Sequence, residues 1–259
     1  MAIVTLTTDF GSADVYAAAM KGVILSAAPG TTLVDITHEI PPRDVVAGAL
    51  ALAQVAPFFP VKTIHVAVVD PGVGGPRADI IVEYEGCSFV GPDNGLLTLA
   101  ARHPRHVFRI ENPEFRRVTV SPTFHGRDVL APAAACLARG IPASEAGPPL
   151  ARMAELPVAT LGVPLAEGNG EIIHVDRFGN LITSFEATQP PSGTWEMELE
   201  WTDLRFTAVA GRTYADVSPG NLVLYVGSSG QIEIAVRDGS AAEVTGARRG
   251  TRLRLRRTS

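Results

Sequence analysis

Hydrophobic and polar residues follow two different periods along this chain. Up to about residue 150, short runs of β-branched residues alternate with Ala-rich stretches of helical spacing. We expect strands at residues 3–10, 31–38 and 63–70, and helices at residues 14–27, 44–56 and 126–139. This alternation is typical of a largely parallel sheet that is covered by helices.

A glycine-rich stretch, PGVGGPR at residues 71–77, follows the third expected strand. Two further strands are expected at residues 78–84 and 87–94, joined by Glu85-Gly86, with a short helix at residues 95–102. The glycine-rich loop therefore joins a strand to a strand. Ligands of such sheets bind beyond the carboxyl ends of the strands, which is where Asp9 and Asp70 fall.

The pattern changes near the middle of the chain. Residues 141–170 are rich in Pro, Gly and Ala with little periodicity, which indicates a boundary or a covering segment. Beyond it we expect strands at residues 170–176, 180–185, 195–201, 204–210, 222–227, 231–237 and 251–257. The strand pattern indicates a compact antiparallel β-barrel or sandwich. The predicted fold is an α/β N-terminal domain, residues 1–155, with a largely parallel sheet and covering helices, and an all-β, barrel-like C-terminal domain, residues 168–259.

Composition and charge remove several classes of function. With 46% hydrophobic residues the chain has ample material for folded cores. Its 22 Lys and Arg residues are outnumbered by 27 Asp and Glu, and the basic residues cluster only near the end, so we expect no nucleic-acid partner. The terminal Arg residues alternate with Leu253 and Leu255, which indicates the exposed face of a last strand.

The chain carries no recognisable membrane or export signal. Its N-terminal residues lack the basic stretch and long apolar core of a secretory signal, and no run of about 18 apolar residues occurs. We therefore expect a cytoplasmic protein with no membrane partner. Cys87 and Cys136 are too few for a disulfide framework, and we expect buried thiols.

Common cofactor motifs do not fit their structural context. The GVGG string lacks the third glycine of the dinucleotide fingerprint and precedes a strand instead of a helix, and no P-loop occurs. A metal-dependent nucleotide or phosphoester hydrolase remains an alternative, because five candidate ligands lie near expected element ends: Asp9, Asp70, Asp93, His125 and Asp128. Two of these have a structural interpretation as well: Asp9 as a turn or cap residue after a strand, and Asp128 as a helix cap or as a partner of Arg127.

Five strings in a fixed order carry a resemblance. They are TTDFG at residues 7–11, VVDPGVGG at 68–75 followed by Arg77, TFHGRD at 123–128, DRFGN at 176–180 and GSSGQIEIAV at 227–236. Together they resemble the S-adenosyl-L-methionine (SAM) hydroxide adenosyltransferases, also called adenosine-forming SAM hydrolases. The same superfamily includes halogenating enzymes, which attack SAM with fluoride or chloride.

The resemblance implies an activity and an assembly. It implies hydrolysis of the substrate SAM to adenosine and L-methionine without a metal or other cofactor. It also implies a homotrimer, whose active sites combine the N-terminal domain of one subunit with the C-terminal domain of the next. A non-catalytic sensor of SAM or adenosine remains a second alternative.

The resemblance also assigns residues to roles. The hydrolytic triad falls on Asp70, Arg77 and His125, and we hypothesise that these side chains hold one water in line with the ribose 5′ carbon. Asp9 matches the carboxylate that binds the ribose hydroxyls, and Asn180 the amide that reads the adenine edge. The remaining substrate-binding candidates match aromatic positions or positions near the methionine moiety: Phe124, Asp176, Phe178, Tyr214, Ser228 and Ser229.

Departures from the halogenating enzymes favour hydrolysis. Those enzymes have Tyr in place of His125, Ser in place of Gly126, and no acid in place of Asp70. A carboxylate repels an incoming halide, whereas it accepts a hydrogen bond from water. Ser229 stands where some relatives have Arg, so the resemblance does not assign the contact that binds the methionine carboxylate.

Overall fold

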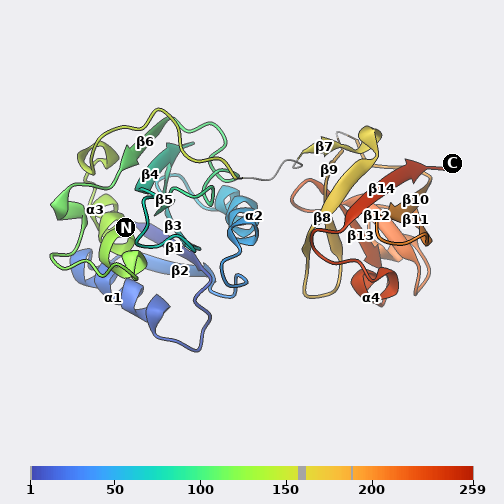
Figure 1. Cartoon of the computed structure of the whole chain (residues 1–259), viewed down its shortest axis with the longest axis horizontal. Coiled ribbons are helices and arrows are strands. Elements are labelled where there is room, and N and C mark those ends of the chain that lie inside the picture. The colour runs from blue at the N-terminus through green and yellow to red at the C-terminus, as the bar shows by residue number, and fades with distance from the viewer. Residues whose placement is uncertain (1, 157–161, 188, 259) are drawn as a thin grey trace. The chain divides into compact units, whose positions relative to one another are not determined.

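A computed structural model of the chain describes residues 2–156, 162–187 and 189–258. Its internal contacts divide the chain into two compact units, Met1–Pro157 and Val158–Ser259. Figure 1 shows a unit of mixed helices and strands followed by a unit of strands. The domain limits expected from the sequence, 1–155 and 168–259, stay a prediction, because residues 157–161 lie outside the described residues.

The first unit is built on a six-stranded sheet in the order β2-β1-β3-β5-β4-β6. Its strands are β1 (Ile3–Thr8), β2 (Thr32–Thr37), β3 (Ile64–Val68), β4 (Asp79–Tyr84), β5 (Cys87–Pro92) and β6 (His106–Arg109). Strands β2, β1, β3 and β5 run parallel, and β4 is antiparallel to both of its neighbours. The expected, largely parallel sheet is confirmed.

Helices cover both faces of this sheet (Figure 1). They are α1 (Tyr16–Ala27), α2 (Val45–Val55) and α3 (Ala131–Ala138). Alternate residues of β3 enter two separate cores: Val66 packs with α1 and α3, whereas Ala67 packs with α2. Because both faces are covered, β3 is apolar along its length, apart from the buried His65.

Two local expectations in the first unit need correction. The short helix expected at residues 95–102 is a series of turns. Gly95 has a left-handed φ of +94° and lies against Leu156, so the backbone follows this tertiary contact and not the local helix pattern. The helix expected at residues 126–139 begins with a π-helical turn, Gly126–Leu130, before α3.

The second unit is a closed barrel. Its strands are β7 (Val163–Pro164), β8 (Asn169–Val175), β9 (Leu181–Glu186), β10 (Thr194–Leu199), β11 (Arg205–Ala210), β12 (Leu222–Val226), β13 (Gln231–Val236) and β14 (Arg252–Arg257). They pair in the order β13-β12-β11-β10-β14-β8-β9-β7, and a pairing of β13 with β9 closes a ring. β7 adds to β9 outside this ring.

Each strand expected in this half is present, and the short helix α4 (Ala241–Thr245) is an addition that the pattern did not predict. Leu253 and Leu255 of β14 are buried while its Arg residues are exposed, as expected. Among the described residues, no helix is long and apolar enough to cross a membrane.

Candidate functional site

The carboxyl ends of the parallel strands open onto a cavity of about 440 Å³. Asp9 directly follows β1, and Asp70 follows β3 by two residues, so neighbouring parallel strands carry both side chains to the same edge. Both residues line the cavity, as do Phe124 and His125 from the segment before α3. The structure therefore brings together four of the predicted site residues from distant parts of the sequence.

Arg77 binds two carboxylates at once. Its Nε donates to Asp70 Oδ1 at 3.1 Å, and its Nη2 donates to Asp70 Oδ2. On the other side, Nη1 donates to Asp79 Oδ1. All three side chains are about nine-tenths buried or more. A planar guanidinium with fixed donors suits this double contact, so Arg77 is held rigidly by ion pairs on two sides.

His125 joins the cluster through Asp79, a residue that the sequence analysis did not predict. Its Nδ1 lies 2.8 Å from Asp79 Oδ2 and 3.2 Å from Arg77 Nη2. Asp79 is the first residue of β4 and is nearly buried. The sequence did carry a signal, because a carboxylate two residues after Arg77 in an extended segment lies on the same face.

A second ionic cluster holds the loop that carries His125. Asp128 is fully buried and accepts bidentate hydrogen bonds from Arg127 at 2.7 Å each, one from Arg117 at 3.1 Å and one from the Ser121 backbone. The Arg127 hydrogen bonds hold the pKa of Asp128 at about 2. The expected pairing of Asp128 with Arg127 is confirmed, and it ties both ends of the segment before α3 together.

Aromatic rings form the apolar part of the cavity wall. Phe124 stands edge-on to Tyr16 and Phe10, with ring centroids 5.2 and 5.9 Å away, and all three residues line the cavity. The Arg127 guanidinium lies 4.9 Å from the Phe124 ring centre. Phe124 is thus fixed in place on the cavity wall by its aromatic neighbours and by Arg127.

Asp9 has a structural contact in addition to its place on the cavity wall. Its Oδ2 accepts a hydrogen bond of 2.8 Å from the backbone nitrogen of Arg43, in the segment that leads into α2. Arg43 has a left-handed φ of +67°. The turn interpretation and the ligand interpretation of Asp9 are therefore compatible.

Three of the predicted residues of the second unit, Asp176, Phe178 and Asn180, lie in the turn between β8 and β9. Asp176 Oδ1 accepts hydrogen bonds from the backbone nitrogens of Phe178 at 2.8 Å and Asn180 at 2.9 Å, and its Oδ2 accepts from Asn180 Nδ2 at 2.8 Å. Asn180 is buried, whereas the Phe178 side chain is 77% exposed. A turn built this way fixes the Asn180 amide and leaves an aromatic ring uncovered beside it.

A hydrogen-bonded chain extends from this turn to β12 and β13. Asn180 Nδ2 lies 3.3 Å from the Tyr214 hydroxyl, which lies 2.9 Å from the Tyr225 hydroxyl, and Tyr225 donates to Glu233 at 2.7 Å. Burial raises the pKa of both Tyr225 and Glu233. Tyr225 and Glu233 are further residues that the sequence analysis missed.

Ser228 and Ser229 lie in the turn between β12 and β13, next to this chain. Glu233 fills the space where Gly227 lacks a side chain. Ser228 is exposed, and among the described residues the buried Ser229 Oγ has no hydrogen-bond partner. A buried hydroxyl needs a hydrogen-bond partner, and the described residues supply none for Ser229 Oγ.

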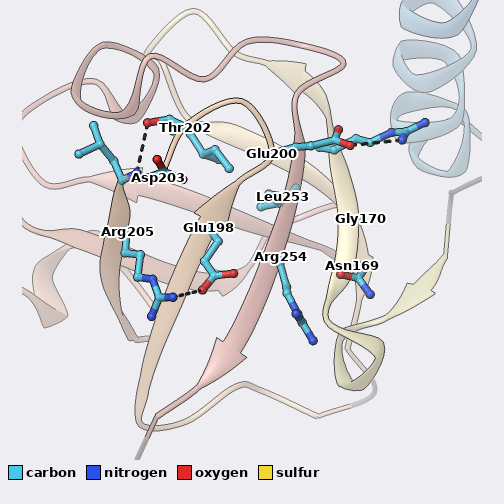
Figure 2. Close-up of a pocket in the computed structure, with 12 residues that line it drawn as sticks. Asn169, Gly170, Glu198, Glu200, Thr202, Asp203, Arg205, Leu253 and Arg254 are labelled. Atoms are coloured by element: carbon cyan, nitrogen blue, oxygen red, sulfur yellow. Dashed lines mark hydrogen bonds and ion pairs between the residues drawn. The ribbon is translucent and has the colours of Figure 1, made fainter.

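A second hollow, of about 470 Å³, lies on the barrel surface (Figure 2). Four of its charged side chains form two ion pairs: Arg205 lies 3.1 Å from Glu198, and Arg252 lies 3.6 Å from Glu200. None of the predicted site residues lines it. Within the part of the chain that the structure describes, no group of His, Cys, Asp and Glu is arranged to hold a metal ion.

Comparison with known proteins gives consistent matches along the chain. The profile of the SAM hydroxide adenosyltransferase N-terminal domain matches residues 4–147, and that of the C-terminal domain matches residues 170–254. An (R)-S-adenosyl-L-methionine hydrolase from Salinispora tropica is 41% identical over 260 residues, which cover 97% of each protein. A fluorinase from an Actinoplanes species is 26% identical, over 90% of each.

The fold also matches a solved structure. The crystal structure of an uncharacterized conserved protein from Thermotoga maritima is similar with a TM-score of 0.88 and 32% sequence identity. The match covers 98% of this chain and 100% of the other.

Proposed function

Because this chain belongs to the SAM hydroxide adenosyltransferase family, we propose that it hydrolyses SAM to adenosine and L-methionine. The observation that supports this most directly is the Asp70–Arg77–His125 cluster, which borders the same cavity as Asp9. This arrangement puts groups that can orient a water beside a carboxylate that can hold a ribose.

The difficult part of this reaction is the activation of the nucleophile. The sulfonium of SAM leaves as a neutral thioether, so the leaving group needs no proton. Water must attack the 5′ carbon in line with the carbon–sulfur bond, and bulk water, with a pKa of about 15.7, is a weak nucleophile. In this proposal Arg77 supplies fixed positive charge, His125 binds the water, and Asp70 orients Arg77 and accepts a hydrogen bond.

The remaining predicted residues bind the substrate in this proposal. Asp9 holds the ribose hydroxyls, Asn180 reads the adenine edge, and the methionine moiety meets Asp176, Ser228 and Ser229. Phe124, Phe178 and Tyr214 provide aromatic surface. SAM is the substrate, and the reaction as proposed uses neither a metal nor another cofactor.

The assembly and location are proposals as well. The protein forms a homotrimer whose subunits share active sites, and it acts in the cytoplasm without a nucleic-acid or membrane partner. The family resemblance supports the trimer. Cell fractionation would test the location.

The function is tested by incubating the purified protein with SAM and separating the products by chromatography. We expect adenosine and methionine in equal amounts, unchanged by exhaustive chelation and by added chloride. Loss of activity on chelation would favour the metal-dependent alternative. SAM that stays bound and intact would favour a sensor.

A further inference from the structure

The cluster at the cavity contains one carboxylate more than the predicted triad, and its contacts indicate what that carboxylate does. Asp79 lies 2.8 Å from His125 Nδ1 and also binds Arg77. We infer that Asp79 is a positioning residue, which holds His125 in the Nδ1-protonated form so that Nε2 accepts the proton of the attacking water. This inference rests on the proposed hydrolysis of SAM.

The hydrogen-bond inventory of the cluster fixes the tautomer. A carboxylate only accepts, so the bond between Asp79 Oδ2 and His125 Nδ1 requires a proton on Nδ1. Arg77 Nη2, at 3.2 Å from the same nitrogen, is a donor as well and has Asp70 Oδ2 as its acceptor. In a neutral imidazole the free lone pair therefore lies on Nε2.

The position of Nε2 suits a proton acceptor. His125 lines the cavity and keeps 18% of its side-chain surface exposed, more than Asp70, Arg77 or Asp79. Among the residues that the structure describes, none is hydrogen-bonded to Nε2. The nitrogen opposite the Asp79 contact is thus the one left for a bound water.

Asp70 is less available for the same step. Arg77 occupies both of its oxygens, with Nε on Oδ1 and Nη2 on Oδ2. Each oxygen retains one lone pair for a hydrogen bond, but proton transfer to Asp70 would weaken a buried ion pair. Proton transfer to His125 instead creates a positive charge next to Asp79, which stabilises it.

The proposed step breaks the carbon–sulfur bond of SAM and one O–H bond of water. The water oxygen forms a bond to the 5′ carbon while the carbon–sulfur bond breaks, and its electron pair goes to sulfur, which gives neutral methionine thioether. One O–H bond of the water breaks, and its proton moves to His125 Nε2. The imidazolium then releases this proton to solvent, so SAM and water become adenosine, methionine and a proton.

The tautomer can be measured directly in the wild-type protein. In protein labelled with ¹⁵N-histidine, long-range ¹⁵N–¹H correlation spectra distinguish the two neutral tautomers, and the His125→Gln spectrum identifies the His125 signals. We expect Nδ1 protonated and Nε2 unprotonated at a pH where the ring is neutral. An Nε2-protonated ring in the wild-type protein would overturn the inference, whether or not SAM is hydrolysed.

Kinetics then show whether Asp79 affects catalysis through His125 or through Arg77. We expect Asp79→Asn to lower kcat by about 10- to 10⁴-fold, with KM for SAM nearly unchanged. The upper limit is the loss that is typical when a carboxylate that fixes the tautomer of a catalytic histidine is replaced by an amide. In a His125→Gln background the same substitution should have almost no further effect, because coupled residues are not additive. Equal losses in both backgrounds would show that Asp79 acts through Arg77 alone, and would overturn the inference.

A matched control is available on the same strand. Glu83, also in β4, lies 2.9 Å from His106 Nδ1, and this carboxylate–histidine pair is partly exposed and away from the cavity lining. We expect Glu83→Gln to leave kcat and the His125 tautomer unchanged. If wild-type protein shows the expected tautomer but no adenosine, the proposed function fails and the positioning contact stands.

Discussion

Arg77 shows how far single residues can be interpreted from sequence. The family resemblance assigns Arg77 a role next to Asp70, and the structure places the two in direct contact. The sequence analysis did not single out Asp79, because Asp79 lies outside the motifs that carry the family resemblance. The role inferred for Asp79 comes from the structure, where it is buried and lies 2.8 Å from His125 Nδ1. Period-2 spacing in an extended segment predicts a shared face, but it does not predict which contact forms there.

At this scale we predict the effect of losing the Asp70 carboxylate. Asp70→Asn should lower kcat by roughly 10²–10⁴-fold, because the amide no longer forms the ion pair that orients Arg77. Binding of adenosine, measured by calorimetry, should be nearly unchanged. Undiminished turnover in the purified variant would remove Asp70 from the mechanism.

A second residue-scale prediction concerns acid stability. His65 is fully buried in β3, its Nδ1 lies 2.8 Å from Thr5 Oγ1, and burial lowers its pKa from 6.5 to about 4. Between these values only the unfolded chain binds the proton, so this contribution to stability is complete above pH 6.5 and is lost as pH falls to 4. We expect it to amount to about 3 kcal/mol.

Urea unfolding of wild type and His65→Leu at several pH values measures this. Relative to its own value at pH 8, the free energy of unfolding should fall less on acidification in the variant. Parallel curves for the two proteins would mean that His65 titrates normally in the folded state.

At the scale of elements, the sequence predicted most strands and helices because their hydrophobic periods are long and regular. It failed at residues 95–102, where a left-handed Gly95 and packing against Leu156 override a local pattern. It also missed β6, a strand of only four residues, and the π-helical turn that follows His125. These features depend on neighbours that lie far away in the sequence.

The glycine-rich loop between β3 and β4 packs directly on the segment that carries His125. Gly74 has a φ of +76°, and a Cβ there would lie 2.5 Å from the carbonyl oxygen of Pro122. We predict that Gly74→Ala separates the two loops and lowers kcat at least about tenfold, since small displacements of positioned groups are costly. Steady-state kinetics and circular dichroism would check that activity falls while the fold persists.

Gly72→Ala serves as the control in the same loop. A Cβ at Gly72 would meet Arg77 Cγ at 3.7 Å, an ordinary van der Waals distance. We expect a clearly smaller loss of activity than for Gly74→Ala. Equal losses would indicate that the loop tolerates no side chain at either position, and not that the contact with Pro122 matters.

At the scale of the whole molecule, the change from helix-and-strand pattern to strands alone predicted two kinds of architecture, and the structure has both. The sequence did not predict that the strands of the second unit close into a ring, because strand patterns do not distinguish a barrel from a sandwich. The hydrophobic pattern also does not predict the number of subunits, because assembly depends on surface residues that periodicity does not describe.

The proposed trimer makes a specific prediction about mixed subunits. Light scattering should give a mass of three times 27.3 kDa. If each site draws residues from two subunits, co-expression of Asp70→Asn with Asn180→Ala should restore activity, because about a quarter of randomly mixed sites would be intact. No recovery above either variant alone would contradict shared sites.

The ionic cluster also bears on how a catalytic cycle ends. With the His125 ring neutral, the cluster of Asp70, Arg77, Asp79 and His125 carries one negative charge. In the proposed mechanism this charge attracts the sulfonium of SAM, whereas adenosine and a thioether are uncharged at that position. A proton accepted by His125 would cancel the charge at the same moment. The electrostatic attraction that helps to bind SAM would thus be lost as the products form, which favours product release.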